Sequence, residues 1–521
     1  MTSAPGTPVT EGGNRRAPGT GPATDTGTAP PAGSPVRKLL GAVWLWPALV
    51  AAALTLYNLG GPVMWHDELA TISVVNRSTG QILATLHNVD AVHGAYYLSL
   101  HFWVSLVGDS PFAIRFPSAM AMVAATVCTA VVGKKLFGDR SGIAAGLVFA
   151  LLPTVARYGQ ETRSYALVVM SSALALLLLV RALERPGPLR WVVYTLSVGL
   201  VGYFNLVALT FLAGHALLVL VRFRETRARR LLVGFTASAV GAVVLVYPVL
   251  HLGGEQSKRQ IGWVPKPTVH GLATIWPQIF GSLLLVLLLL LLALPALLRK
   301  PRGEVLAVVG MVFIPWLLVW GVSHGSSSYY LSKYLFFLLP PSALLVGAGL
   351  GSLRTRYLVP LTLAVAAVAA PAQRDMHAPL SHAEYTYPDP LWFTPLDYRA
   401  AAGIVAAGYR PGDGMVYGQK YSVWWEESVG IPYYLPSDVQ PPTLFVGETA
   451  TRRNDLWFTF CKDPAACLGD HPRLWLVAVG DVKDAFSSVP ANQSAVLRPH
   501  YTVQERRTVS GITVFLLVRK A

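Results

Sequence analysis

The sequence predicts an α-helical protein that crosses a membrane many times and carries a small α/β domain at its C-terminus. Of its 521 residues, 53% are hydrophobic and only 13% are charged, whereas soluble domains carry roughly 25% charged residues. Long apolar runs such as 231–250 and 283–298 account for the difference. Because lipid offers no hydrogen-bond partner to a free backbone group, these runs are expected to cross the bilayer as helices.

The distribution of the net charge of +15 favours a membrane protein over a nucleic-acid-binding one. Residues 372–521 contain 14 Lys and Arg against 15 Asp and Glu, so the positive excess lies in the first 371 residues. There the basic residues form short clusters between apolar runs, as cytoplasmic loops do. We therefore expect a lipid bilayer as partner, and no nucleic acid.

Five basic clusters determine the predicted topology, because Lys and Arg concentrate on the cytoplasmic side. They lie at 134–140, 181–190, 222–230, 299–302 and 354–356. Placing all five inside predicts a multi-pass cell-membrane protein with about eleven transmembrane helices, a cytoplasmic N-terminus and an extracytoplasmic C-terminal domain. The predicted spans fall near 39–58, 116–133, 141–156, 165–182, 191–204, 206–221, 231–250, 275–298, 305–321, 334–353 and 357–371.

Two regions precede the C-terminal domain. Residues 1–36 are mostly Gly, Pro, Thr, Ala and Ser, and they are predicted to be a disordered cytoplasmic tail because they have little to bury. Residues 37–371 form the transmembrane domain, whose first outer loop is 59–115. Within that loop His93–Val107 is apolar and aromatic but too short to span. We expect it to form a helix at the outer interface.

Residues 372–521 are predicted to form an extracytoplasmic α/β domain. Its predicted elements are a helix at 397–408 and strands at 473–479 and 512–518. Cys461 and Cys467 lie close together in this domain. An outward location would allow a disulfide between them, and the alternative of two free thiols stays open.

The membrane domain has few carboxylates that could do chemistry outside. Under the predicted topology the outward ones are Asp67, Glu68, Asp90, Asp109, Glu161 and Glu255. Asp67 and Glu68 are adjacent at a membrane surface, where two like charges resist burial. A base that takes a proton from an acceptor hydroxyl needs such a group. The alternative is a pair of solvated loop residues at the start of a helix.

A second group of charged residues, Arg157 to Tyr165, lies at the outer end of a predicted span. It contains Arg157, Gln160, Glu161, Arg163 and Tyr165. Arginines on the outer side break the positive-inside trend, and a bound phosphate would account for them. An interfacial salt-bridge cluster with a Tyr anchor is the alternative.

Lys333 is a lone cation at the outer end of the tenth predicted span. It could contact a phosphate, or it could extend towards lipid headgroups. The sequence favours neither explanation.

No motif identifies a cofactor. His66 or His93 could join Asp67 in a metal site, but no pair has a strong ligand spacing, so we predict no metal ligands. Dependence on a divalent cation is left open. There is no P-loop, no dinucleotide fingerprint and no Gly-x-Ser-x-Gly motif, which argues against an ATP-driven pump and a hydrolase of that kind.

Five short segments in order resemble the bacterial C-type (GT-C) membrane glycosyltransferases related to protein O-mannosyltransferases and to the lipid A aminoarabinose transferase. They are His66-Asp67-Glu68, His93 with Tyr96-Tyr97-Leu98, Gly108–Ser118, Tyr158–Leu167 and Lys333-Tyr334-Leu335. The order and spacing match over roughly residues 40–350, and five segments in order are a more specific signal than any one segment.

The resemblance implies an inverting hexosyl- or pentosyltransferase. It would move a mannose- or arabinose-like sugar from a polyprenyl-phosphate donor to a glycan, glycolipid or protein acceptor at the outer face of the cytoplasmic membrane. It makes Asp67 the general base, with Glu68 as its partner. It assigns the donor phosphate to Arg157, Arg163 and Lys333, and substrate contacts to His66, His93, Tyr97, Gln160, Glu161 and Tyr165.

Two other classes of function remain as alternatives. A transporter or lipid flippase of cell-envelope precursors would show internal repeats and charges near the bilayer midplane. We find no obvious repeat, and the unusual charges gather at outer helix ends. A non-catalytic scaffold would not require Asp67.

Overall fold

The computed structural model describes residues 42–298, 303–381, 395–419 and 424–521. The chain divides into a short N-terminal unit, Met1–Ala42, and one compact unit, Val43–Ala521, to which all contacts below belong. The predicted tail, residues 1–36, lies outside the described residues.

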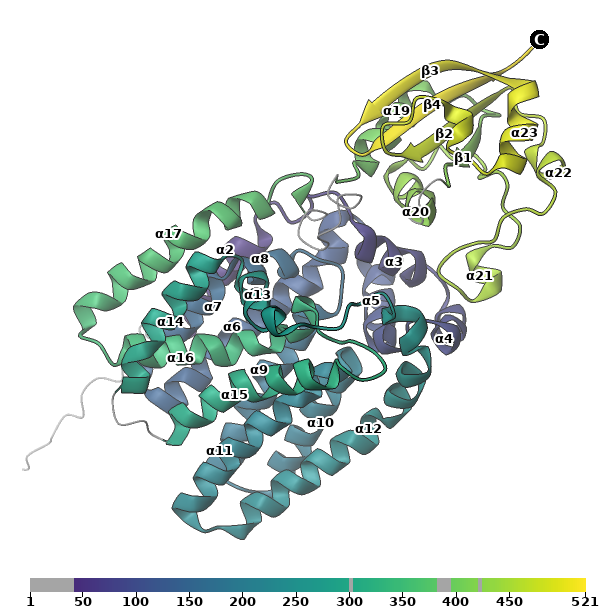
Figure 1. Cartoon of the computed structure of the whole chain (residues 1–521). Helices are drawn as coiled ribbons and strands as arrows, with labels where there is room; N and C mark the ends of the chain where they lie inside the picture. Colours follow the sequence, from purple (N-terminus) through teal and green to yellow (C-terminus); the bar gives the residue numbers. More distant parts are fainter. Residues whose placement is uncertain (1–41, 299–302, 382–394, 420–423) are drawn as a thin grey trace, which may run out of the picture. The chain divides into compact units, whose positions relative to one another are not determined.

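Most of the compact unit is a bundle of long apolar helices (Figure 1). Seven described helices are long and apolar enough to cross a membrane: α6 (Pro111–Phe137), α9 (Tyr165–Glu184), η2 with α11 (Leu206–Thr226), α12 (Arg229–Ile261), α15 (Gly303–Val322), η3 with α16 (Ser332–Gly351) and η4 with α17 (Thr355–Met376). Two bent pairs also qualify if each is one span: α7 (Asp139–Leu151) with α8 (Pro153–Gly159), bent by 61°, and α13 (Val269–Phe280) with α14 (Leu283–Leu298), bent by 91°.

The helical membrane class is confirmed, but the count of eleven spans is not. Length and composition support seven to nine among the described residues. The two remaining predicted spans coincide with α2 (Leu45–Leu56), which has 12 residues, and α10 (Pro188–Phe204), which has 17. At about 1.5 Å per residue, both are shorter than the roughly 30 Å thickness of the hydrocarbon core.

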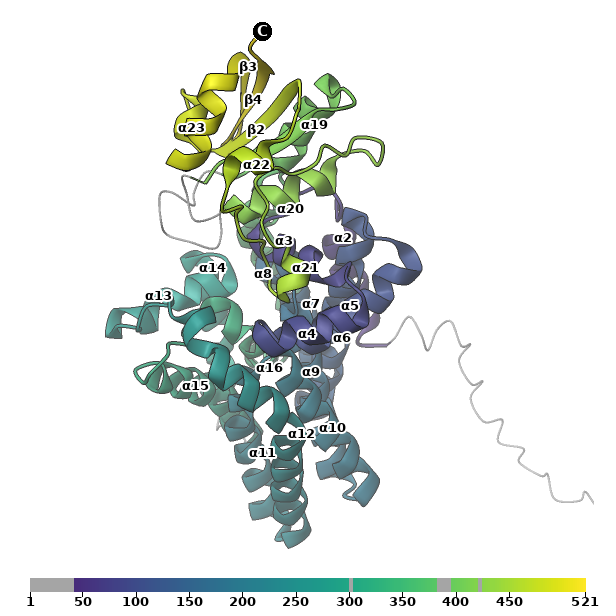
Figure 2. The ribbon, with the colours of Figure 1, turned by 90° about the vertical axis from the view of Figure 1, so that its right-hand side faces the viewer.

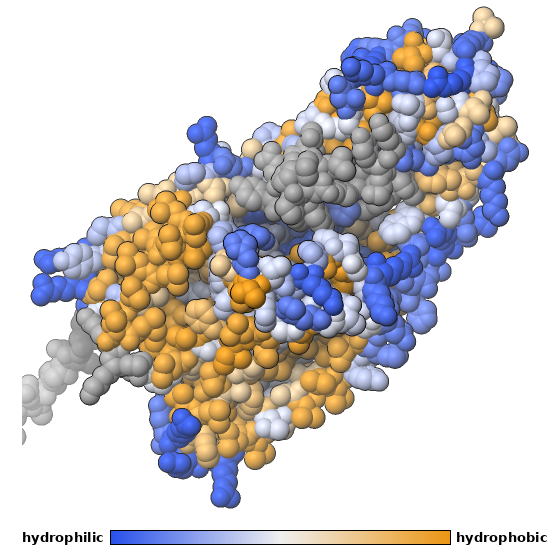
Figure 3. Space-filling model, in the orientation of Figure 1, coloured by the Kyte–Doolittle hydropathy of each residue, from blue (hydrophilic) through white to orange (hydrophobic). Residues whose placement is uncertain are grey.

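The surface of the helical part is suited to lipid. Hydrophobic side chains cover much of it in Figure 3, and hydrophilic ones gather at its ends and on the C-terminal domain. Leu284, Leu287 and Leu291 of α14 are all exposed. Exposed leucines at this density are unfavourable in water and favourable in a bilayer.

The first outer loop folds into four short helices: α3 (His66–Val75), α4 (Thr79–Asn88), η1 (Ala91–His93) and α5 (Gly94–Val107). The predicted helix in His93–Val107 is therefore present as α5. Its first half is buried at Tyr96, Tyr97 and Leu100, whereas Phe102 and Leu106 are exposed. This division suits a helix that rests on the membrane surface.

The C-terminal domain is a four-stranded sheet with helices on both faces (Figures 1 and 2). Its strands are β1 (Gly414–Tyr417), β2 (Arg473–Val479), β3 (Tyr501–Val509) and β4 (Ile512–Arg519), and its helices are α19 (Tyr398–Gly408), α20 (Trp424–Tyr434), α21 (Ala450–Arg453), α22 (Pro464–Leu468) and α23 (Ala491–His500). The strand order is β1-β2-β4-β3, with β1 and β2 parallel and the other pairs antiparallel. The predicted helix and both predicted strands are confirmed.

The side chains of β2 point alternately to the two faces of the sheet, and this explains why helices cover both faces. Leu474 and Leu476 belong to the same apolar cluster as Leu497 of α23. Trp475 points to the other face, where a Cβ atom at Gly408 of α19 would lie 2.7 Å from the indole ring. Successive strand residues point to opposite sides, so this strand needs helices on both.

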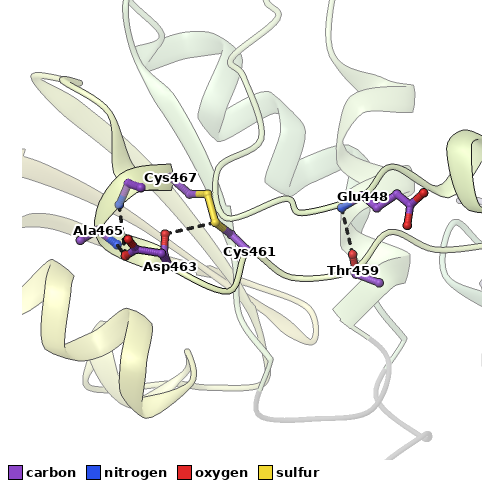
Figure 4. Close-up of a disulfide and its surroundings, with 7 residues drawn as sticks. Glu448, Thr459, Cys461, Asp463, Ala465 and Cys467 are labelled. Carbon is purple, nitrogen blue, oxygen red and sulfur yellow. Dashed lines mark hydrogen bonds between the residues drawn. A yellow bond between two sulfur atoms is a disulfide. The ribbon is translucent and has the colours of Figure 1, made fainter.

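A disulfide joins Cys461 and Cys467 (Figure 4). It closes the segment that leads into α22, where the Asp463 carboxylate accepts hydrogen bonds from the backbone N–H groups of Ala465 and Ala466. The disulfide and the N-cap together hold this short helix, whose five residues would not be stable alone.

Candidate active site

Asp67 lies at the centre of a buried cluster of charged residues that are far apart in the sequence. It is in the first turn of α3, where the helix dipole favours a negative charge. Lys333 Nζ donates a 2.7 Å hydrogen bond to Asp67 Oδ2, and Arg163 Nη2 is 3.7 Å from Asp67 Oδ1. The structure therefore brings together the sequence-derived base candidate and two of the three phosphate-binding candidates.

The two cations control the protonation of Asp67. Burial by itself raises the pKa of this carboxyl group, but the charges of Lys333 and Arg163 outweigh that effect and hold the pKa well below its usual range. Asp67 is therefore an anion at neutral pH. In this arrangement it is also a poor proton acceptor.

Arg163 links the cluster to α5 and η1. Its Nη1 donates to Tyr97 Oη at 3.2 Å, and its Nη2 is 3.3 Å from His93 Nε2. Tyr97 in turn donates to Asp90 Oδ2 at 2.8 Å. Burial and the adjacent Arg163 lower the pKa of His93 well below its usual value, so its neutral Nε2 can accept the hydrogen bond from Arg163.

Lys333 lies between two aromatic rings. Its Nζ is 5.5 Å from the centroid of Tyr165 and 5.7 Å from that of Trp65. Ring faces attract a cation and exclude water from it. The rings and Asp67 together allow Lys333 to remain charged while it is only 7% exposed.

Glu68 lies beside Asp67 in sequence but contacts different residues. Arg115 of α6 donates to both carboxylate oxygens, from Nε at 2.8 Å and from Nη2 at 2.7 Å. The backbone N–H of Thr162 donates to Glu68 Oε1 at 2.9 Å. Glu68 thus ties α3 to α6 and to the segment that carries Arg163, and it is fully buried.

Arg157 and Glu161 form a separate buried pair. Arg157 Nη1 donates to Glu161 Oε2 at 2.5 Å, and the guanidinium lies 5.4 Å from the centroid of the Trp65 ring. Burial raises the pKa of Glu161 to about 7, although Arg157 acts in the opposite direction. Gln160 faces away from this pair, because its amide donates to the carbonyl oxygens of Thr55 and Tyr57 at the end of α2.

His66, which precedes Asp67, contacts the C-terminal domain. Its Nδ1 is 2.5 Å from Glu426 Oε1, and Glu426 Oε2 accepts a 3.0 Å hydrogen bond from Tyr398 Oη. Sequence reasoning missed Glu426, since nothing around it differs from an ordinary helix start. Arg115 lies in the segment Gly108–Ser118 that carries the resemblance, but it was not predicted as a site residue.

An apolar cavity of about 260 Å³ adjoins the charged cluster. Its polar lining residues are His93, Ser164, Tyr165, Asn205, Thr210, Ser257, Gln260, Tyr329 and Tyr334. Its apolar lining includes Phe204, Leu206, Leu250, Ile261, Val319 and Val322. The site thus combines a cationic centre with space for an apolar chain.

No group of three or more His, Cys, Asp or Glu side chains within the described ranges could hold a metal ion. The residues around Asp67 are instead cations and aromatic rings. This composition suits an anionic ligand better than a metal.

Solved structures of similar fold indicate the fold class to which this chain belongs. ArnT from Cupriavidus metallidurans in the apo state is 12% identical, with a TM-score of 0.58, and the match covers 92% of this chain and 98% of that chain. The same protein bound to undecaprenyl phosphate is 12% identical, with a TM-score of 0.57 and coverage of 91% and 97%. The chain therefore has the fold of the C-type membrane glycosyltransferases.

A family model matches part of the chain. Residues 94–251 match the model described as dolichyl-phosphate-mannose-protein mannosyltransferase. The match begins at α5 and ends within α12, so it includes Arg157 and Arg163. Comparison with curated protein sequences returned no match. The resemblance to C-type membrane glycosyltransferases is thereby confirmed.

Proposed function

We propose that this protein transfers a sugar from a polyprenyl-phosphate donor to an acceptor hydroxyl at the outer face of the membrane. One observation carries the proposal: the Asp67 carboxylate lies against Lys333 and Arg163, next to an apolar cavity. A lipid phosphate matches both halves of this site. The match to a family named for a lipid-phosphate mannose donor supports it.

The donor would occupy the site in two parts. Its phosphate would bind Lys333 and Arg163, whose neighbours Tyr165 and His93 line the cavity. The first part of its apolar chain would enter the cavity. Arg157, held by Glu161, would add positive potential behind them. The structure of ArnT bound to undecaprenyl phosphate supports a lipid-phosphate ligand for this fold.

Donor binding would also activate the base. A phosphate that draws Lys333 and Arg163 towards itself removes the charges that lower the pKa of Asp67. Burial then dominates and raises that pKa. The carboxylate becomes a better proton acceptor at the moment when the donor is in place.

The chemical step is a single displacement. Asp67 takes the proton of the acceptor hydroxyl, and the hydroxyl oxygen bonds to the anomeric carbon of the sugar. The bond from that carbon to the phosphate oxygen breaks, and its electron pair leaves with the lipid phosphate, whose charge the two cations neutralise. Attack opposite the leaving group inverts the anomeric centre.

The other candidate residues take supporting parts in this mechanism. Glu68 positions Asp67 and Arg163, because its carboxylate is bound by Arg115 and by Thr162 N–H. His93, Tyr97 and Tyr165 surround the two cations, so we assign them to the donor. Gln160 secures the segment 160–164 against α2.

We also propose that the C-terminal domain, with its disulfide, lies outside the cell, on the same side as Asp67. Two observations support this orientation. Disulfides persist in oxidising compartments, and the near-neutral charge of residues 372–521 is typical of an outer segment. The bounds of the tail, the membrane domain and this outer domain remain those predicted above.

Sugar transfer in membranes tests the proposal. Membranes with the full chain are supplied with radiolabelled polyprenyl-phosphate mannose, arabinose, galactose and glucose in turn, and label in glycan, glycolipid and protein is measured. We expect sugar transfer from one of these donors. This transfer should be lost in Asp67→Asn and kept in Glu255→Gln. Glu255 is a matched control because it is an exposed carboxylate of α12. Full activity of Asp67→Asn would exclude Asp67 as the base.

A further inference from the structure

The C-terminal domain borders the candidate active site through α20. A Cβ atom at Gly430 would lie 2.7 Å from the ring of Tyr398 and 3.2 Å from Leu69 of α3, so α20 packs closely on both. The backbone N–H of Met64 donates to Tyr434 Oη at 2.9 Å. These contacts hold α20 at the start of the helix that carries Asp67.

Other contacts already attach the domain to this region. Arg399 of α19 donates to the carbonyl oxygens of Gly60 and Gly61, at 3.2 and 3.0 Å. Tyr433 donates to the carbonyl oxygen of Asp109 at 2.6 Å. Attachment alone therefore does not require a buried carboxylate at the interface.

Glu426 is nevertheless such a carboxylate, and both of its oxygens are used. It is 2% exposed. One oxygen lies 2.5 Å from His66 Nδ1, and the other accepts from Tyr398 Oη at 3.0 Å. A carboxylate at Nδ1 fixes the orientation and the tautomer of an imidazole.

His66 is the first residue of α3, and its side chain is 30% exposed. Asp67, its neighbour in sequence, is buried. His66 is therefore a partly exposed side chain that interacts electrostatically with the buried carboxylate proposed to deprotonate an acceptor.

The charges around His66 favour its protonated form. Burial lowers the pKa of the imidazole, but Glu426 and Asp67 outweigh burial and raise it, while Lys333 opposes them. Glu426 is the larger of the two favourable influences. Loss of its charge should therefore lower the pKa of His66.

We propose that Glu426 is a positioning residue for sugar transfer, which holds His66 beside Asp67 on the acceptor side of the site. This inference rests on the proposed function. It makes the C-terminal domain part of the active site, so the membrane domain alone would have an incomplete acceptor side. The ligand of this side is a hydroxyl group of the acceptor.

The variant Glu426→Gln tests the inference, because it keeps the shape of the side chain and removes its charge. We expect kcat to fall by about 10- to 100-fold, because a misplaced catalytic environment loses the benefit of orientation, with a change of less than about twofold in the KM for the donor. The limb of the pH–kcat profile that reports His66 should move to lower pH. Glu448→Gln is the matched control, since Glu448 is an exposed carboxylate of the same domain.

A double-mutant comparison separates positioning from simple structural support. If Glu426 acts through His66, then Glu426→Gln has no further effect in a His66→Gln background. Equal losses in both backgrounds would overturn the inference. Tyr398→Phe, which keeps the charge of Glu426 and removes one of its hydrogen bonds, should cause a smaller loss of kcat than Glu426→Gln.

The same assay distinguishes the two possible failures. If the unmutated protein transfers sugar and Asp67→Asn does not, the proposed function stands. Unchanged kcat and an unchanged pH profile in Glu426→Gln would then overturn this inference alone. No transfer by the unmutated protein from any of the four donors would overturn the proposed function, and this inference with it.

Discussion

Lys333 and Asp67 are 266 positions apart in the sequence, yet a 2.7 Å hydrogen bond joins the ammonium group of one to the carboxylate of the other. The pair connects η3, at the start of a late span, to the first outer loop. Because both groups are buried, neither can lose its partner without a large cost. The proposed mechanism depends on an exchange of partners, in which the donor phosphate replaces Asp67 as the partner of Lys333.

Neutralising Lys333 should weaken donor binding. A charge-assisted hydrogen bond contributes about 1.5–3 kcal/mol, so Lys333→Met should raise the KM for the polyprenyl-phosphate donor about 10- to 100-fold. Lys258→Met is the control, because Lys258 is an exposed lysine of α12. A donor KM that does not change in Lys333→Met would contradict the role in phosphate binding.

Removing Arg115 should destabilise the fold. Arg115→Met leaves the Glu68 carboxylate buried without its forked partner, which should lower the free energy of unfolding by about 3–5 kcal/mol. Thermal unfolding in detergent measures this, with Arg374→Met, an exposed arginine of α17, as control. The double variant Arg115→Met/Glu68→Gln should recover part of the loss. If Arg115→Met unfolded at the same midpoint temperature as the unmutated protein, this stabilising role of Arg115 would be refuted.

The raised pKa of Glu161 predicts a pH dependence of stability. Between pH about 4.5 and about 7 the folded protein holds a proton on Glu161 that the unfolded chain has lost. The stabilisation that comes from protonated Glu161 is complete below the pKa that this group has in the unfolded chain. It is lost as the pH rises through the pKa that the group has in the folded protein. The midpoint temperature of unfolding should therefore fall as the pH rises from about 4.5 to about 7. It should fall less steeply in Glu161→Gln. Equal slopes in both proteins would show that Glu161 does not titrate there.

A side chain at Gly254 should obstruct the apolar cavity. Gly254 lines the cavity, and no atom lies within 4 Å of an added Cβ. Gly254→Phe should therefore fold and raise the KM for long-chain donors more than for short-chain ones. Gly403→Phe tests the general effect of such a change, because Gly403 has the same free space in α19. Equal effects on long and short donors would mean that the lipid chain lies elsewhere.

The disulfide makes the orientation of the C-terminal domain measurable. With an impermeant maleimide on intact cells, Cys461 and Cys467 should be labelled only after treatment with an impermeant reductant. Cys128, half-buried in α6, should remain unlabelled. The variant Cys461→Ser/Cys467→Ser should give no signal. Labelling that requires lysis of the cells would place the domain inside.

The sequence by itself determined the class of the protein. Hydropathy and charge clusters are local properties, and they predicted the helical membrane domain and the α/β domain with one of its helices and two of its strands. They did not predict the number of spans. Bends such as that of 91° between α13 and α14 depend on how helices pack, and α2 and α10 are shorter than a full crossing. The resemblance selected Asp67, Arg163 and Lys333 as candidates but placed none of them in space.

Only the tertiary structure decided which charged residue pairs with which. Adjacent in sequence, Asp67 and Glu68 have different partners: Lys333 for one and Arg115 for the other. Glu426 reaches His66 from a different domain. Such pairs depend on the packing of helices that are hundreds of residues apart, and no local pattern records that packing. This is why the sequence could propose the residues of the site, but not their partners or the contribution of the C-terminal domain.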